Sequence, residues 1–367
     1  MATASQSTII RKAQVPVSCY FCKGQGIKWK CEDCNVRMCD SCKVTVHQGL
    51  RCSQDHDVIS IQDIGKSPQS SQEVTSVVIS SVCDSYTTTL PAVHTLLCAD
   101  DDLLYFTYNG SVSDKHLLVK GKRFQSSIKI LQTLKRRICD IAINKDSEIL
   151  FIEYHDNKVQ VLSLTGEVKT VLESSPMTLL GIHVNKDNEV IVGLRGPGPP
   201  FPVNDFSARQ VIIFGSDYHR RVTLEFDKKG NKLFSYAKRI CTDSKNYLYV
   251  VDCIDNIHNG RIVAVDRNCR LRFTYGGQKN FGTFQPTGIT ITPSDNIVIA
   301  DLFNYAIHVI DSKGDLLGLQ FIFIDLGIVD PYSVCFDTKG YLLIGSGKDK
   351  NDIYGKIYVA KMTDSLT

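Results

Sequence analysis

The stretch PTGITITPSDNIVIADLFNYAIHVIDSKG, residues 286–314, contains three short apolar runs separated by turn-forming residues. The runs at 288–291, 297–300 and 307–310 are rich in isoleucine and valine, which favour β-strands. Ser-Asp-Asn and Asp-Ser-Lys-Gly sequences follow the first and third runs, and such residues favour turns. A fourth apolar run begins two residues after Gly314. The stretch therefore predicts a unit of four short strands joined by tight turns.

The same pattern recurs through most of the chain. Its equivalent hydrophobic positions lie 45, 41, 58, 49 and 45 residues apart, and they are Leu96, Ile141, Ile182, Ile240, Ile289 and Val334. Repeats of about four strands at a spacing of ~40–50 residues are typical of β-propellers. The sequence predicts a mainly β fold with a six-bladed propeller over residues 74–367. A seven-bladed or WD40-type packing is the alternative.

The last repeat ends near Met362, about one strand short of a complete blade. Because a propeller leaves no blade edge unpaired, a strand from elsewhere has to close the ring. An apolar segment at about 74–88 precedes the first repeat, and we expect it to complete the sixth blade. One unit resembles the NHL repeat, and the other copies match it loosely; the residues that carry this resemblance are Ala300, Asp301, Asn304, Ile307, Val309 and Asp311.

A second motif lies near the N-terminus, where three Cys-x2-Cys pairs and two histidines occur within forty residues. The eight candidate ligands are Cys19, Cys22, Cys31, Cys34, Cys39, Cys42, His47 and His56. Zinc in structural sites takes four nitrogen or sulfur ligands in a tetrahedron. Eight ligands therefore predict two closed, structural zinc ions in a module covering about 18–62, which depends on the metal to fold. Spacing alone leaves open which pairs share an ion.

This spacing, together with the sequence His-Asp-Val-Ile at 56–59, resembles the B-box zinc finger of tripartite-motif (TRIM) proteins. The resemblance implies a cross-brace, in which one ion is bound by Cys19, Cys22, Cys39 and Cys42 and the other by Cys31, Cys34, His47 and His56. Cys52 lies between the two histidines and is an alternative to His56 as the eighth ligand. Trp29, the only tryptophan, is expected to pack over this module.

The remaining composition suggests a soluble protein from a reducing compartment. Seven of the 14 cysteines lie in the zinc module, and the others are scattered without a pairing rhythm, as expected where disulfides do not form. The sequence shows no secretory signal and no apolar run of the ~18–20 residues that would span a membrane. We therefore expect a cytoplasmic location, with a disordered lead at 1–17 and a polar linker at 63–73.

Three features of the propeller region are candidates for binding. The insertion at 195–205, with four prolines, predicts an exposed loop with Phe201 at its tip, either a contact element or a spacer. Asp252 and Asp301 follow second strands and are either calcium ligands in the channel or turn anchors. Basic residues form a candidate RNA-binding surface or an ordinary solvated surface; they include Lys115, Lys120, Lys122, Arg123, Lys129, Lys135, Arg136, Arg137, His219, Arg220, Arg221, Lys228, Lys229, Lys238 and Arg239.

The resemblance to TRIM–NHL proteins implies a function in ubiquitin-related or innate-immune signalling. Members with a RING finger are ubiquitin ligases, but this sequence has no RING before Cys19 and no coiled coil after His56. The first hypothesis is a zinc-binding protein-interaction adaptor. The alternatives are an RNA-binding post-transcriptional regulator and a ubiquitin ligase that acts through the B-box.

Sequence motifs for catalysis are missing. The chain has no Gly-x-Ser-x-Gly, no phosphate-binding glycine loop and no His-Glu-x-x-His, which are the signatures of common hydrolases, nucleotide-binding enzymes and metalloproteases. We therefore predict that the protein is not an enzyme, has no small-molecule substrate, and uses zinc only structurally. Its expected partners are proteins, with RNA as the alternative and no membrane contact.

Overall fold

The computed structural model describes residues 18–24, 26–31, 36–47, 58–60, 77–110, 116–278, 281–349 and 352–367. The chain divides into two compact units, Met1–Glu73 and Val74–Thr367. The expected lead at 1–17, the linker at 63–73, and Cys34, Cys52 and His56 lie outside the described residues.

The first unit contains a small antiparallel sheet in the strand order β2-β1-β3. Trp29 of β1 is opposite Met38 of β2 on one side and Ser60 of β3 on the other. A helical turn follows β2 and continues to His47. The elements are β1 (Trp29–Cys31), β2 (Val36–Met38), α1 (Asp40–Cys42), a π-helical turn (Lys43–His47) and β3 (Val58–Ser60).

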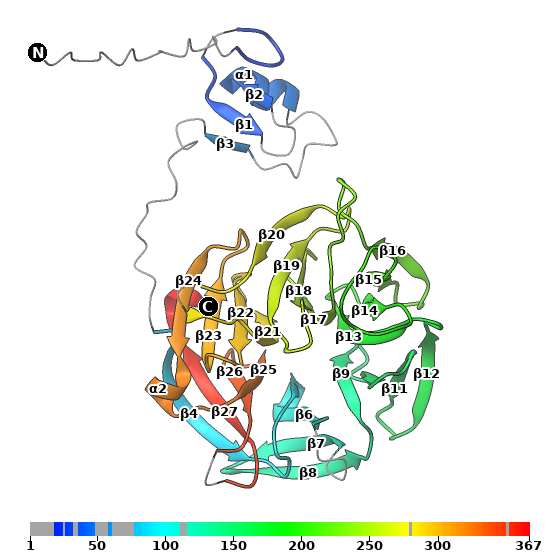
Figure 1. Ribbon diagram of the computed structural model, residues 1–367. Helices are drawn as coiled ribbons and strands as arrows, with labels where there is room; N and C mark the ends of the chain where they lie inside the picture. The colour runs from blue at the N-terminus through cyan, green and yellow to red at the C-terminus, as the bar shows by residue number, and fades with distance from the viewer. Residues whose placement is uncertain are drawn as a thin grey trace, which may run out of the picture. The chain divides into compact units, whose positions relative to one another are not determined.

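The second unit consists of six four-stranded antiparallel sheets arranged as blades around a channel (Figure 1). The prediction of a mainly β, six-bladed propeller is confirmed. The innermost strands of neighbouring blades contact one another in a closed ring. Blades 1 to 3 are β5 (Thr95–Ala99), β6 (Leu103–Tyr108), β7 (Leu117–Phe124) and β8 (Ser127–Leu134); β9 (Ile138–Ile143), β10 (Ile149–Glu153), β11 (Lys158–Leu162) and β12 (Val168–Glu173); and β13 (Thr178–Val184), β14 (Val190–Arg195), β15 (Arg209–Phe214) and β16 (Arg220–Leu224).

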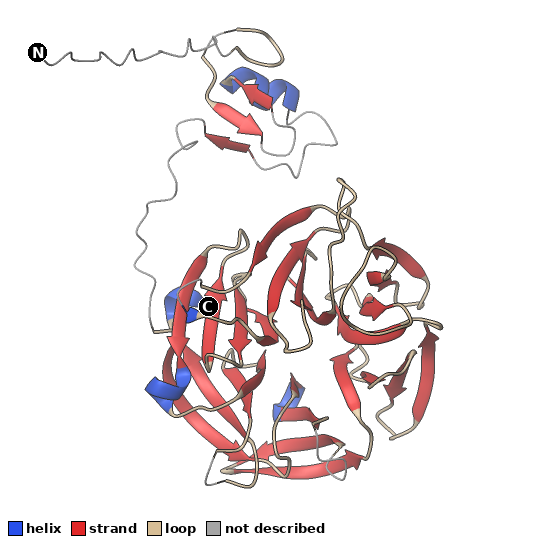
Figure 2. Ribbon diagram, in the orientation of Figure 1, coloured by secondary structure: helices blue, strands red, loops and turns tan. Residues whose placement is uncertain are grey.

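Blades 4 to 6 repeat this arrangement, and almost all regular structure in the unit is strand (Figure 2). Their strands are β17 (Ala237–Thr242), β18 (Leu248–Cys253), β19 (Gly260–Val265) and β20 (Leu271–Tyr275); β21 (Pro286–Ile291), β22 (Ile297–Asp301), β23 (Ala306–Ile310) and β24 (Leu316–Phe321); and β25 (Pro331–Phe336), β26 (Leu342–Ser346), β27 (Lys356–Met362) and β4 (Ile79–Thr87). The helical elements are α2 (Ile322–Leu326) and 3-10 turns at Asp100–Asp102 and Asp364–Leu366.

The sixth blade takes its outer strand from the opposite end of the sequence. Strand β4 pairs with β27, and Tyr86 is opposite Ile357. The Gln320 side-chain oxygen accepts hydrogen bonds from the backbone N–H groups of Val78 and Ile79, at 3.0 and 2.7 Å. The chain that enters the propeller is thereby attached to blades 5 and 6, and the ring is closed.

Apolar side chains between adjacent blades form the core. Each of the six junctions has its own cluster of buried residues, and the second strands, such as β18 and β22, are buried along their whole length. Sheets covered on both faces favour continuous apolar runs, which explains the Val- and Ile-rich sequences. Burial of such a side chain contributes roughly 1.5–3 kcal/mol relative to exposure.

The two ends of the propeller differ in their connections. At one end, the first strand joins the second and the third joins the fourth, mostly through five-residue turns such as 163–167 and 311–315. In the second of these turns, Asp311 Oδ1 accepts hydrogen bonds from the backbone N–H groups of Lys313 and Asp315, and Gly314 has φ +92°. The remaining connections, up to the 13-residue loop at 196–208, lie at the opposite end, which we call the long-loop face.

The insertion at 195–205 is a loop on the long-loop face, but Phe201 is not its exposed residue. The Phe201 ring is half-buried, 5.8 Å from the ring of Tyr236, whereas Phe206 is 97% exposed. Two buried arginines fix the loop: Arg195 donates to the Gly198 carbonyl at 2.6 Å, and Arg209 donates to the Pro200 carbonyl at 2.7 Å. The loop is therefore anchored by buried arginines, and its exposed aromatic residue is Phe206.

Candidate functional site

The N-terminal unit brings together four cysteine sulfurs. The Sγ atoms of Cys19, Cys22, Cys39 and Cys42 all lie within 4.8 Å of one another, and those of Cys22 and Cys39 are 3.9 Å apart. Zinc with Zn–S bonds of ~2.3 Å separates its tetrahedral sulfur ligands by ~3.8 Å. The geometry fits a metal ion, and these are the four ligands that the B-box resemblance implies for one of two ions.

Local backbone structure positions these thiols. The turn after Cys19 is closed by hydrogen bonds from the Lys23 N–H to the Cys19 carbonyl and from the Cys19 N–H to the Gly24 carbonyl, both 2.9 Å. Tyr20 N–H donates to the Arg37 carbonyl at 2.8 Å and connects this turn to β2. Cys39 is the N-cap residue of α1 and Cys42 its last residue, and the Lys43 N–H donates to the Cys39 carbonyl at 3.0 Å, so both halves of the cluster are held by backbone contacts.

The electrostatics of the cluster favour a cation. Burial opposes ionisation of Cys19, but backbone N–H groups near Cys22 and Cys39 stabilise its thiolate and lower its pKa to about 6. Burial, together with the neighbouring thiols, raises the pKa of Cys42 to about 12. Ionisation of all four thiols would place negative charges side by side, and a zinc ion bound among them removes this repulsion and stabilises the deprotonated form.

Only two of the four predicted ligands of the second ion lie among the described residues. Cys31 and His47 are both buried, whereas Cys34, His56 and the alternative Cys52 lie outside the described residues. Trp29 packs against the apolar cluster that contains Cys19 and Cys42. Its indole N–H donates to Asp40 at 2.7 Å, and the Lys43 ammonium lies 3.3 Å from the ring centroid.

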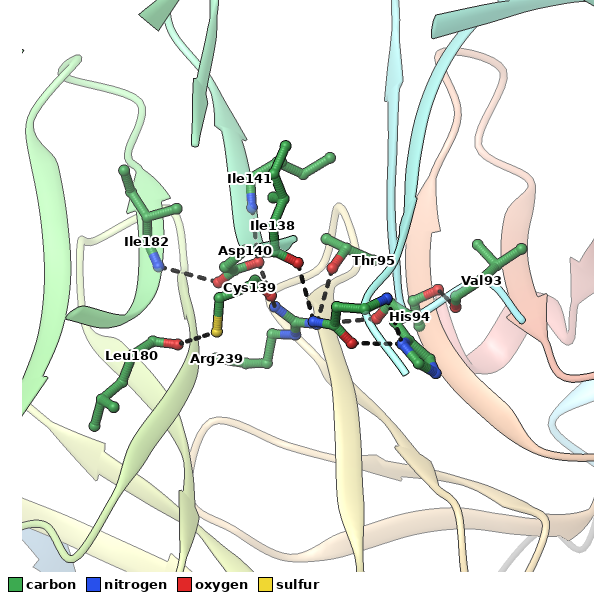
Figure 3. A network of polar contacts seen from close by, with 12 residues as sticks. Val93, His94, Thr95, Ile138, Cys139, Asp140, Ile141, Leu180, Ile182 and Arg239 are labelled. Atoms are coloured by element: carbon green, nitrogen blue, oxygen red, sulfur yellow. Dashed lines mark hydrogen bonds and ion pairs between the residues drawn. The ribbon is translucent and has the colours of Figure 1, made fainter. Parts of the chain in front are cut away.

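The channel of the propeller contains a polar network that the sequence analysis did not identify (Figure 3). The Arg239 guanidinium from β17 forms an ion pair with Asp140 of β9 at 2.5 Å. It also donates to the Thr95 hydroxyl and the His94 carbonyl, both at 2.9 Å, and to the Cys139 carbonyl at 3.0 Å. One arginine from blade 4 thus joins the innermost strands of blades 1 and 2.

Asp140 extends this network to blade 3. Its carboxylate accepts backbone hydrogen bonds from Ile141 and Ile182, both at 3.0 Å. Burial raises the pKa of Asp140, and the Arg239 charge opposes this rise. His183, also in the channel, bonds to the Thr242 hydroxyl at 2.9 Å, and burial lowers its pKa to about 4, so it is neutral at pH 7.

A sequence signal for this network existed. The residues immediately before the six equivalent repeat positions are all small or polar: Thr95, Asp140, Gly181, Arg239, Gly288 and Ser333. Five of the six line a cavity of about 300 Å³ along the channel. Gly288 is needed there, because a Cβ at this position would lie 2.8 Å from Ser333 Cα. The position immediately before each equivalent hydrophobic residue therefore identifies the residues that face the channel.

Asp252 and Asp301 lie at the ends of the second strands of blades 4 and 5, where they anchor the neighbouring turns. Asp252 accepts hydrogen bonds from the backbone N–H groups of Ser235 and Tyr236, both at 2.7 Å, and pairs with Arg261. Asp301 accepts a 2.6 Å hydrogen bond from the Asn304 side chain and lies 3.4 Å from His308. In the part of the chain that the structure describes, the N-terminal cysteines are the only group arranged to hold a metal.

The basic residues of the candidate RNA surface do not gather at one place. Lys122, Arg123 and Lys129 lie by the short turn between β7 and β8, whereas the run 135–137 is at the long-loop face. Lys115 lies outside the described residues. Several arginines contact other side chains: Arg123 pairs with Asp102 and Asp337, Arg136 with Glu153, Arg221 with Asp217 and Arg239 with Asp140, and Arg137 lies over the Tyr154 ring.

Comparison with known proteins identifies the fold and no family. No protein-family model and no curated protein matches the sequence. Among solved structures, similar folds include a streptogramin B lyase (TM-score 0.50, 14% identity, 76% of this chain and 97% of that chain). A luciferin-regenerating enzyme has TM-score 0.54, 13% identity and coverage of 74% and 92%. Regucalcin, a calcium-binding protein from Agrobacterium tumefaciens, has TM-score 0.54, 12% identity and coverage of 75% and 91%.

These neighbours overturn the prediction that the chain is not an enzyme. The structures of a lyase and a luciferin-regenerating enzyme align with about three quarters of the chain. Enzymes therefore use this fold, and a lack of familiar sequence motifs is insufficient reason to exclude activity. No helix in the described residues has the length and apolar character needed to cross a membrane.

Proposed function

We propose that this chain is a zinc-stabilised adaptor whose propeller binds a protein partner through the long-loop face. The TRIM resemblance suggests that the partner belongs to ubiquitin-related or innate-immune signalling. The observation that supports this proposal best is the distribution of exposed apolar side chains between the two ends of the propeller.

Ten large apolar side chains are exposed in the connections of the long-loop face. At the other end, among the described residues, Leu164 is exposed in a short turn and Val77, Phe124 and Leu271 are exposed beside the strand ends, so exposed large apolar side chains are fewer there. Exposed apolar residues concentrated on one surface are typical of protein-interaction sites. The ten are Tyr154, Phe206, Phe226, Ile254, Ile257, Phe281, Phe303, Phe323, Ile324 and Ile353.

Blades 5 and 6 carry the densest part of this surface. The Phe281 ring lies 5.0 Å from that of Phe321, and the Tyr305 ring lies 5.7 Å from that of Phe323. Phe323 and Ile324 are neighbours on α2 and are 50% and 78% exposed. Aromatic clusters of this kind provide much of the binding energy in protein interfaces. We therefore place the centre of the docking surface at α2.

The test compares matched variants of the full chain. Ile324→Asp places a charge in the centre of the proposed surface, and Leu164→Asp makes the same change at the opposite end. Each variant is crosslinked to the proteins of a cell lysate, and the captured proteins are identified by mass spectrometry. The wild type and Leu164→Asp should capture a common set of proteins, and Ile324→Asp should not capture that set. Equal recovery with all three proteins would exclude this surface.

RNA binding is measured in the same preparations. Binding of a random single-stranded RNA pool with a steep negative dependence on salt would indicate several phosphate contacts and favour the alternative function. The dispersed and partly paired basic residues predict weak RNA binding that Ile324→Asp leaves unchanged.

A further inference from the structure

A pocket on the long-loop face, at the junction of blades 6 and 1, has the chemistry of a cation site. Its volume is about 260 Å³. The lining residues that matter for the argument come from four connections: His94 before β5, Tyr108 at the end of β6, Asp330 and Tyr332 at the start of β25, and Lys348 after β26.

Aromatic rings form one wall of the pocket. The His94 ring stacks on Tyr108 with centroids 5.0 Å apart, and it meets the edge of Tyr332 at 4.5 Å. Burial lowers the pKa of His94 to about 4 and raises that of Tyr332 to about 12, so both rings are uncharged at pH 7. Neutral aromatic rings attract cations through the negative charge on their faces.

Asp330 adds a carboxylate with no partner inside the described part of the chain. Its backbone has φ +45°, and its carbonyl accepts a hydrogen bond from Gly347 N–H at 3.0 Å. Gly347 makes room for the side chain, because a Cβ there would lie 2.7 Å from Asp330 Oδ2. The half-buried carboxylate makes no hydrogen bond or ion pair with any described residue, and burial raises its pKa.

Other buried carboxylates of the propeller have partners in the protein. Asp140 pairs with Arg239, Asp252 with Arg261 and Asp337 with Arg123. Partial burial of a carboxylate without a counter-charge is unfavourable. Among the described residues, Asp330 therefore differs from these paired carboxylates in a way that a bound cation would correct.

The nearby positive groups leave this position open to a ligand. Lys348 is exposed at the rim and forms no ion pair with Asp330. Arg239 donates to the His94 carbonyl, but its charge is balanced by Asp140. Lys238 and His116 also lie near His94 and contribute to the lowering of its pKa. These positive groups weaken the long-range attraction between the pocket and a cationic ligand. Such a ligand therefore has to bind by direct contact with the rings and with Asp330.

We propose that this pocket receives the basic side chain of a partner protein, a lysine or an arginine, whose apolar neighbours contact the exposed residues of α2 and the loop that carries Ile353. This inference rests on the proposed docking function of the long-loop face. A peptide fits better than a small free cation, because the two connections that supply Asp330 and Lys348 to the pocket also carry exposed Phe323, Ile324 and Ile353, which a small ion would leave uncovered.

The experiment selects peptides from a random phage-displayed library on the full-length protein and measures their affinities by calorimetry. Peptides selected on the wild type should carry a lysine or arginine next to apolar residues. Asp330→Asn should weaken their binding at least about tenfold, because a charge-assisted contact is lost. Asparagine tolerates a left-handed backbone, so the variant should fold. Asp315→Asn, at an exposed position in the short turn 311–315 at the opposite end of the propeller, is the matched control and should bind normally.

A second variant, Tyr332→Leu, removes an aromatic ring but keeps the carboxylate, and it should also weaken binding. Peptides that lack a basic residue, or that bind Asp330→Asn as tightly as the wild type, would overturn the pocket assignment. If those peptides still lose affinity for Ile324→Asp, the docking surface stands and only the pocket is wrong. Peptides that bind Ile324→Asp normally, or no enrichment at all, would count against both proposals.

Discussion

Arg239 illustrates how a single residue can have a different role from the one its neighbours suggest. In the sequence it follows Lys238 and belongs to a basic cluster. In the structure its guanidinium is buried in the channel and joins strands from three blades. The positive charge of Arg239 is neutralised by Asp140 inside the protein. Removal of either residue would leave the other as a buried charge without a counter-charge.

Replacement of Arg239 by methionine should destabilise the propeller by about 3–5 kcal/mol at pH 7, because Asp140 keeps a buried charge without its cation. Urea unfolding measures the change. Burial already raises the pKa of Asp140, and loss of Arg239 raises it further. Since protonation then favours the folded state, the deficit should shrink as the pH falls toward 4.

The double variant Arg239→Met with Asp140→Asn provides the control. It removes the charge that methionine leaves unpaired, so it should be more stable at pH 7 than Arg239→Met alone. A deficit that is the same at both pH values and in both variants would show that lost packing, not the charge, is responsible.

His183 should make the propeller sensitive to acid. Burial lowers its pKa from 6.5 to about 4 in the folded protein, so the unfolded chain binds a proton first as the pH falls. The contribution of neutral His183 to the free energy of unfolding is fully present above pH 6.5, and it is lost as the pH falls from 6.5 to 4. His183→Gln should flatten the dependence of unfolding free energy on pH over this window. His219→Gln, at an exposed position, should leave it unchanged.

At the scale of elements, strand β4 decides whether the ring is closed. Without it, β27 has a free edge and the hydrogen bonds from Val78 and Ile79 to Gln320 are lost. A chain that starts at residue 89 should therefore aggregate or unfold at a lower temperature, as measured by light scattering and calorimetry. A synthetic peptide of residues 77–88 should restore stability by adding the missing strand. Truncation without any effect would contradict this role.

The elements were largely predictable because their pattern is repeated and local. Strands such as β22 and β23 are continuous apolar runs, and the turn at 311–314 has the aspartate and glycine that its backbone requires. The candidate site was less predictable. The pairing of Asp140 with Arg239 joins residues from different repeats, and their proximity depends on the closure of the ring. The exposure of Phe206 in place of Phe201 depends on two buried arginines outside the loop tip.

At the scale of the whole molecule, the chain combines two units with different sources of stability. The propeller buries apolar clusters at every junction between blades. The described residues of the N-terminal unit form one small apolar cluster, and four of its members are the thiol-bearing residues Cys19, Cys31, Cys39 and Cys42. A unit with so little core needs a metal to fold. Removal of zinc should therefore unfold one unit and leave the other intact.

Trp29 allows this to be measured, because the only tryptophan of the chain lies in the N-terminal unit and packs against the cysteine cluster. Chelation of zinc should change its fluorescence, whereas the β-sheet signal and thermal transition of the propeller should remain. Native mass spectrometry should find two zinc ions in the wild type and one after Cys22→Ser with Cys39→Ser. Retention of both ions by that variant would exclude the four-cysteine site. Loss of the propeller transition on chelation would show that the two units do not fold independently.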